Sequence, residues 1–279
     1  MRGSSCALAL LCFLLLPGLA HTEEPAITVT VGKETRSFTR GELLARPDAT
    51  TIRVARDVSY RVPMTYRAVP VASLLAGTTL PPDSVIEAVA LNGFIAQLPP
   101  DLLLNTDESK AVAWLAIEPA DQPWPLIPGK KQVSAGPFYI VWTGAEVSGI
   151  RSEQWPYQVA KLVSRSSPVS RWPALAVNSA LPPKDPARAG QALFIVQCLT
   201  CHKLNGAGAA DVGPDLDLPQ NPTEYLTPRG LHDLIRNPKA VRSWPAQAMP
   251  GFPEDYLSDR DIGLIIAYLK HMAGRKRPH

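Results

Sequence analysis

The chain has 279 residues, of which 46% are hydrophobic and 19% are charged. This length and composition support packed cores in two ordinary domains and exclude a largely disordered chain. The formal net charge of +3 is too small to indicate a nucleic acid or an anionic membrane surface as the partner.

The first 20 residues have the pattern of a secretory signal peptide. Arg2 provides a positive end, residues 7–16 are apolar, and Gly18-Leu19-Ala20 provides small residues for cleavage. The apolar stretch is too short to cross a membrane as a helix, and no second stretch of spanning length follows. We therefore expect an exported, soluble periplasmic protein that has no stable membrane insertion after cleavage. An uncleaved anchor is the alternative.

Short strands dominate the prediction for residues 21–165. Apolar and polar residues alternate in several stretches, as they do in half-buried strands. Asn92-Gly93 separates two of these stretches and predicts a hairpin turn. Short helices are predicted after Thr39 and over 71–75. The predicted strands lie at 26–31, 51–58, 85–90, 94–98, 111–117 and 138–142. This region is predicted to be a β-rich α+β domain.

The rest of the chain is predicted to be a linker followed by helices. Residues 166–185 are rich in proline and should form a stiff, extended connection. Over 186–279, capping residues followed by prolines or apolar stripes mark helix starts. The expected helices begin after Asp185, Thr227 and Ser258. The predicted fold class is therefore α+β with two domains, a β-rich one followed by an all-α one.

Two cysteines remain beyond the signal segment, Cys198 and Cys201, and His202 follows directly. Two thiols at this spacing can add to two vinyl groups on one edge of a porphyrin, and the next imidazole then lies under the iron. A disulfide or a redox-active cysteine pair does not need the histidine, and a zinc site needs two more ligands. The sequence therefore predicts one covalently attached haem c.

Residues 186–279 resemble the class I cytochromes c. Gly190 and Phe194 match the glycine and aromatic residue of that family's first helix, which pack on an aromatic residue of the last helix. Tyr268 is the matching aromatic residue here. The resemblance implies that these two helices pack against each other near the haem.

The same resemblance gives His202 a hydrogen-bonding partner. Gly213-Pro214-Asp215-Leu216 is similar to the family's loop whose proline carbonyl accepts a hydrogen bond from the iron-bound histidine. By that match, the Pro214 carbonyl accepts the second ring N–H of His202 and orients the ring. Such partners of a metal-bound histidine set its tautomer and its orientation.

Four side chains are candidates for the second axial ligand: Met249, His232, His271 and Met272. Met249 lies in a loop ahead of the last helix, where the family places its methionine. His232 lies off the apolar face of its helix and fits an exposed histidine, and the other two end the last helix. We take Met249 as the ligand. A thioether raises the reduction potential relative to a second histidine, and two protein ligands leave the iron no open site.

Residues 26–165 more distantly resemble the molybdopterin-binding fold of the sulfite oxidase superfamily. The resemblance rests on Tyr66-Arg67-Ala68-Val69-Pro70-Val71, Ala90-Leu91-Asn92-Gly93-Phe94, Gly136-Pro137-Phe138 and Trp155-Pro156-Tyr157. Members that hold molybdenum bind it through a cysteine thiolate, and this region contains no cysteine. The resemblance therefore implies the fold without the cofactor, and no molybdenum is expected.

Three functions fit these patterns. The first is a periplasmic electron carrier that passes single electrons between a redox enzyme and a respiratory acceptor, with the N-terminal domain used for docking or as a scaffold. The second is an oxidoreductase, or its subunit, whose N-terminal domain binds a small anionic substrate. The third is a haem-based sensor or accessory protein. The closed iron site favours the carrier over an enzyme. Four arginines could bind the anion that the second function requires, or they could form a solvated strand face. They are Arg53, Arg56, Arg61 and Arg67.

Overall fold

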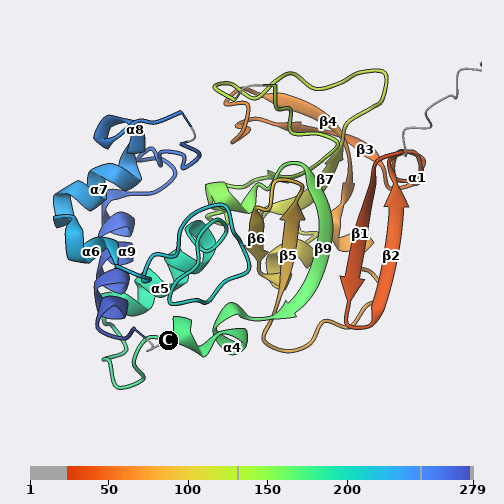
Figure 1. Cartoon of the computed structure of the whole chain (residues 1–279). Helices are drawn as coiled ribbons and strands as arrows, with labels where there is room; N and C mark the ends of the chain where they lie inside the picture. The colour runs from red at the N-terminus through yellow and green to blue at the C-terminus, as the bar shows by residue number, and fades with distance from the viewer. Residues whose placement is uncertain (1–23, 131, 246, 277–279) are drawn as a thin grey trace, which may run out of the picture.

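The computed structural model describes residues 24–130, 132–245 and 247–276. The regular structure of the N-terminal part is mostly strands, and the helices of the C-terminal part pack beside them (Figure 1). This arrangement confirms the predicted α+β fold with two domains. The predicted signal peptide lies outside the described residues. None of the helices in these ranges combines the length and the apolar character that are needed to cross a membrane.

The N-terminal domain contains two sheets. The five-stranded sheet has the order β2-β1-β9-β5-β6, with β1 and β9 parallel, and the four-stranded sheet has the antiparallel order β3-β4-β7-β8. The strands are β1 (Ala26–Val31), β2 (Glu34–Thr39), β3 (Thr50–Val54), β4 (Met64–Pro70), β5 (Ser84–Ala90), β6 (Ile95–Leu98), β7 (Val112–Ile117), β8 (Phe138–Thr143) and β9 (Val159–Ser166). Short helices connect some of them, namely α1 (Arg40–Leu44), α2 (Val71–Leu74) and α3 (Pro100–Leu104).

The predicted hairpin is present, because β5 and β6 pair antiparallel around Asn92-Gly93. The predicted strand over 51–58 is shorter than expected and ends at Val54. The cause is Asp57, whose buried carboxylate accepts hydrogen bonds from the backbone N–H groups of Ser59 (2.9 Å) and Tyr60 (2.8 Å). Asp57 thereby turns the chain out of the strand. The sequence analysis did not predict β2, β4 or β9.

The segment between the domains differs from the extended linker that its prolines predicted. It contains α4 (Pro168–Arg171) and a 3-10 helix, η2 (Pro173–Leu175). Arg171 forms an ion pair with the buried Glu87 of β5. Leu175 is fully buried in the C-terminal core, and its carbonyl accepts a hydrogen bond from the Tyr268 hydroxyl (2.6 Å). The segment is therefore packed onto both domains.

The C-terminal domain is built around the crossing of its first and last long helices. Its helices are α5 (Pro186–Gln197), α6 (Pro222–Tyr225), α7 (Pro228–Arg236), α8 (Pro238–Val241) and α9 (Asp259–Ala273). The three predicted helices are present, with Asp185, Thr227 and Ser258 as their caps. The rings of Phe194 and Tyr268 meet where α5 and α9 cross, with centroids 5.3 Å apart.

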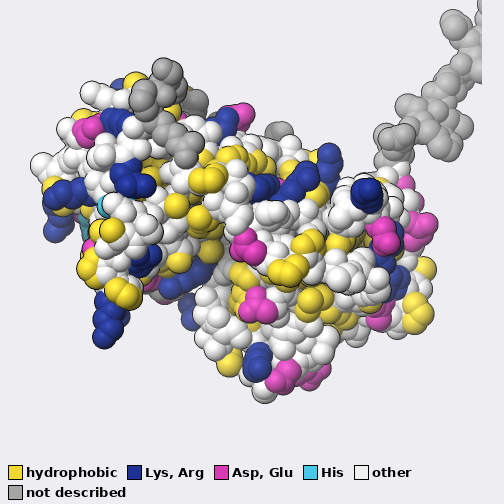
Figure 2. Space-filling model, turned by 90° about the horizontal axis from the view of Figure 1, so that it is seen from below, with side chains coloured by type: hydrophobic (Ala, Val, Ile, Leu, Met, Phe, Trp, Pro, Cys, Tyr) yellow, Lys and Arg dark blue, Asp and Glu magenta, His cyan; other side chains and the backbone are white. Residues whose placement is uncertain are grey.

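The two domains contact each other through an edge strand. The strand β6 lies at the end of its sheet, where one side of the backbone has no partner strand. The N–H of Ile95 donates a hydrogen bond to the carbonyl of Thr200 (3.1 Å), which lies between the two cysteines. Arg151 also forms an ion pair with Asp261 of α9 (2.8 Å). Hydrophobic side chains gather near the junction of the domains (Figure 2).

The close approach of α5 to α9 predicts the effect of a methyl group at Gly190. A Cβ at this position would lie 2.0 Å from the carbonyl oxygen of Leu264 and 2.8 Å from Cβ of Tyr268. Gly190→Ala should therefore push the helices apart and lower the free energy of unfolding of the C-terminal domain by about 1–3 kcal/mol or more. Chemical denaturation followed by circular dichroism measures this change.

Gly263→Ala on α9 is the matched control, because nothing lies within 4 Å of a Cβ there. Alanine favours a helix over glycine by about 1 kcal/mol, so this variant should be as stable as the parent or more stable. Equal destabilisation by the two variants would show that the helix crossing does not depend on the missing side chain of Gly190.

Candidate haem site

A cavity of about 460 Å³ opens between α5, α7, α9 and the loops of the C-terminal domain. This volume is within the range of about 300–1,000 Å³ that is usual for cofactor sites. Polar groups enter it at a few points only. The apolar side chains of its wall include Leu216, Leu231, Leu234, Ile235, Phe252, Ile265 and Leu269. The cavity is therefore suited to a large apolar group.

The end of α5 delivers two thiols and an imidazole to this cavity. Cys198 is the C-terminal cap of α5, and the carbonyl of Cys198 accepts hydrogen bonds from the N–H groups of Cys201 (3.1 Å) and His202 (2.9 Å). Both thiols are free. Burial raises the pKa of both, that of Cys201 to about 11, and the carboxylate of Glu153 acts in the same direction. They stay protonated at neutral pH, unlike the low-pKa thiols of redox-active cysteine pairs.

The His202 ring is held by the Pro214 carbonyl, with 2.8 Å between Nδ1 and the oxygen. Because a carbonyl only accepts hydrogen bonds, Nδ1 carries the proton and Nε2 keeps a free lone pair. Burial lowers the pKa of His202, which favours the neutral ring. Gly213 leaves room for this ring, since a Cβ there would lie 2.5 Å from Cε1 of His202.

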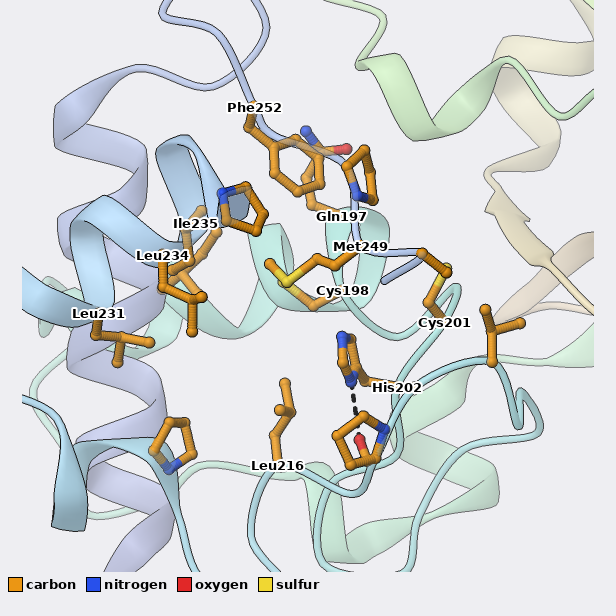
Figure 3. Close-up of a pocket in the computed structure, with 18 of the residues that line it drawn as sticks. Gln197, Cys198, Cys201, His202, Leu216, Leu231, Leu234, Ile235, Met249 and Phe252 are labelled. Atoms are coloured by element: carbon orange, nitrogen blue, oxygen red, sulfur yellow. Dashed lines mark hydrogen bonds between the residues drawn. The ribbon is translucent and has the colours of Figure 1, made fainter. Parts of the chain in front are cut away.

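Met249 lies on the other side of the same cavity. Figure 3 shows its thioether on one side and the His202 ring on the other, with the second ring nitrogen directed away from Pro214. The loop that carries Met249 is anchored to the end of α7. The N–H of Phe252 donates to the carbonyl of Ile235 (3.2 Å), and the Arg236 guanidinium donates to the carbonyl of Leu257 (2.7 Å).

The other three candidate axial ligands have different partners, and none of them lines the cavity. Nε2 of His232 lies 2.8 Å from a carboxylate oxygen of Asp259, at the start of α9. Nε2 of His271 accepts a hydrogen bond from the N–H of Asn178 (3.1 Å). Met272 is 1% exposed and packs in the helical core.

The donor groups and the wall of this cavity fit a haem. The two thiols, the imidazole and the thioether match the groups that hold a c-type haem. The side-chain amides of Gln197 and Gln247 also line the cavity, and their buried nitrogen and oxygen atoms have no hydrogen-bond partner in the described part of the chain. Buried polar atoms normally have a partner, and a bound group with polar substituents, such as the haem propionates, would supply one.

The sequence analysis missed both of these glutamines and Glu153. Glu153 belongs to the N-terminal domain, in the 3-10 helix η1 (Ser152–Gln154), and yet it lines the cavity next to the cysteines. Burial raises its pKa to about 7. No local pattern marks this residue, because its position depends on how the two domains pack.

The comparison with protein families agrees with this geometry. Residues 185–269 match the family model described as cytochrome C oxidase, cbb3-type, subunit III. The match begins at the cap of α5 and ends within α9, so it covers the cavity and leaves the N-terminal domain outside. No curated protein matches the chain. The match therefore supports a C-terminal cytochrome c domain, and with it a haem-containing electron-transfer protein.

Proposed function

We propose that this domain binds one haem c covalently through Cys198 and Cys201, with His202 and Met249 as the axial ligands of the iron. When bound, the haem supplies one site that exchanges a single electron by cycling between Fe(III) and Fe(II). The observation that carries the proposal is the placement of His202 and Met249 on opposite sides of one apolar cavity, with Nε2 of the histidine free.

Covalent attachment needs no outside oxidant or reductant. Each thiol adds across the double bond of one vinyl group, so that a sulfur–carbon bond forms and the thiol hydrogen moves to the neighbouring vinyl carbon. The two cysteines line the same cavity and follow each other in one turn of chain. Pro214 holds the proton on Nδ1 of His202, which leaves Nε2 for the iron.

The residues of the site favour a carrier over a catalyst. His202 and Met249 would both bind the iron of a bound haem, and a substrate would then have no position there. The pattern of residues 1–20 supports an exported protein, and we place it in the periplasm, where a redox enzyme and a respiratory acceptor would be its partners. The N-terminal domain contacts the cysteine segment through the hydrogen bond from Ile95 to Thr200, which supports a role as a scaffold or docking module.

Covalent attachment predicts that the haem stays with the unfolded chain. The protein should be produced together with a haem c attachment system, denatured in acid and extracted with an organic solvent. We expect the mass of the polypeptide to include one haem, and the solvent phase to be colourless. The double variant Cys198→Ser/Cys201→Ser should release any haem that it binds. Extraction of haem from the parent protein would contradict the proposal.

Replacing Met249 should open the iron. In Met249→Ala the thioether is lost, so the reduction potential should fall by on the order of 0.1 V, a fraction of the ~0.8 V range that axial ligands set. Carbon monoxide should bind to the reduced variant and not to the reduced parent. Met272→Leu is the control. Met272 packs in the helical core and does not line the cavity, and leucine has a volume similar to that of methionine. An unchanged potential in Met249→Ala would exclude Met249 as a ligand.

Arg236 should position the loop that carries Met249. Its guanidinium donates to the carbonyls of Phe252 and Leu257 and forms ion pairs with Glu254 and Asp259. Arg236→Gln should lower the free energy of unfolding by about 1–3 kcal/mol, because several charged hydrogen bonds are lost. The absorption band of the iron–methionine bond should also disappear at a lower temperature than in the parent.

The matched control for Arg236 is Arg229→Gln on the same helix. The Arg229 side chain is 85% exposed and forms a surface ion pair with Asp233, so its loss should leave the stability nearly unchanged. The methionine band should melt as in the parent. If both variants lose the band at the same temperature, the anchoring role of Arg236 is wrong.

A further inference from the structure

A second cavity, of about 260 Å³, lies where the two domains meet. We call it the interdomain chamber. Its N-terminal side includes Arg61, Lys130 and Tyr157, and its C-terminal side includes Cys201 and Phe252. Cys201 lines this chamber as well as the haem cavity, so the chamber lies directly beside the proposed attachment point.

Two cations line the chamber from the N-terminal domain. The Arg61 side chain has no hydrogen-bond or ion-pair partner within the described ranges, whereas Arg56 nearby is paired with Asp255. The ammonium of Lys130 donates to the Tyr157 hydroxyl, a neutral group, and lies 4.7 Å from the centre of its ring. These contacts leave both positive charges without a full counter-charge.

One carboxylate faces these cations among the described residues of the chamber, that of Glu153. Burial raises its pKa to about 7, so it carries only part of a negative charge at neutral pH. Asp57 lies behind the chamber wall, where its carboxylate accepts hydrogen bonds from the hydroxyl groups of Tyr66 (2.8 Å) and Tyr139 (3.3 Å). The chamber is therefore positive overall and attracts anions.

Apart from the polar residues Ser59, Asn92 and Ser152, most of the remaining lining is apolar or aromatic. It includes Phe94, Ile127, Trp155, Val212 and Phe252, from both domains. A ligand that matches this lining has a flat or apolar body and a single anionic end. The volume is below the usual range for drug-sized ligands, so the ligand must be small.

We propose that the interdomain chamber binds a small organic carboxylate, with its anionic end between Arg61 and Lys130 and its apolar body toward Cys201. This proposal rests on the proposed haem attachment for its functional meaning, because a ligand in the chamber lies beside the edge of the haem that the cysteines hold. The chamber itself is formed by the protein and is tested by binding. With this site, the N-terminal domain would bind a ligand in addition to its proposed role as a scaffold.

The test is calorimetric titration of the full-length, haem-loaded protein with benzoate, a flat carboxylate of suitable size. We expect saturable binding of one benzoate per chain. Arg61→Gln and Lys130→Gln should each weaken the affinity about tenfold, and Lys130→Arg should largely restore it, because it keeps the charge. Arg53→Gln removes one exposed charge of β3 outside the chamber and should leave the affinity unchanged.

Two further probes separate the kinds of recognition. Benzyl alcohol has a similar shape without the charge, and sulfate has charge without an apolar body, so both should bind at least tenfold more weakly than benzoate. Failure of benzoate to bind, or equal binding by the parent and by both glutamine variants, would overturn the proposal. Thermal melting of each variant checks its folding, and the result for one of the two glutamine variants stands if the other does not fold.

A second measurement connects the chamber to the haem. An anion beside the haem edge stabilises the oxidised iron, so benzoate should lower the reduction potential of the parent. At a concentration close to the dissociation constant of the parent, the decrease should be several-fold smaller in Lys130→Gln, because its site is then mostly empty. By linkage, benzoate must then bind more tightly to the oxidised protein than to the reduced protein, and the shift in potential fixes the ratio of the two affinities. The extraction experiment above is done on the same samples. Extractable haem with specific benzoate binding contradicts the attachment and supports the chamber, and covalent haem without benzoate binding does the reverse.

Discussion

The haem site depends on how closely α5 packs against α9. Gly190 has no side chain at the crossing, so the backbones of the two helices touch, and Phe194 and Tyr268 fill the space beside this contact. Since α5 ends at the first cysteine, the crossing sets where both thiols and His202 enter the cavity. The same α9 supplies part of the cavity wall. A change in the distance between the helices therefore changes both the ligands and the wall together.

The features that sequence analysis predicted correctly are local ones. Thr39 and Glu42 cap each other's backbone groups at α1, and Asp185 and Ser258 cap α5 and α9, so each helix start is encoded within four residues. The cysteine–histidine segment is local in the same sense. The assignment of the axial ligands and the covalent bonds remains a prediction, because only measurements on the haem-loaded protein test it.

Several of the features that it missed depend on partners far away in the chain. The strand β9 lies between β1 and β5 in the sheet. It pairs with β1 in parallel, although more than a hundred residues separate β1 from β9 in the chain. The linker was expected to be extended, yet Leu175 is buried against the last helix. Glu153 reaches the haem cavity only because the domains pack together. Burial and pairing of this kind are decided by tertiary contacts, which short patterns do not record.

The hydrogen bond from Ile95 to Thr200 has a mechanical consequence. A domain on a free tether visits many positions, and its contact with a second site depends on an effective concentration. Here the edge of the sheet is bonded to the segment between the two cysteines, and Arg151 is paired with α9. The sheet and the helical domain are therefore joined by direct contacts as well as by the linking segment. A partner bound to the N-terminal domain would be held close to the haem site, rather than brought to it by diffusion.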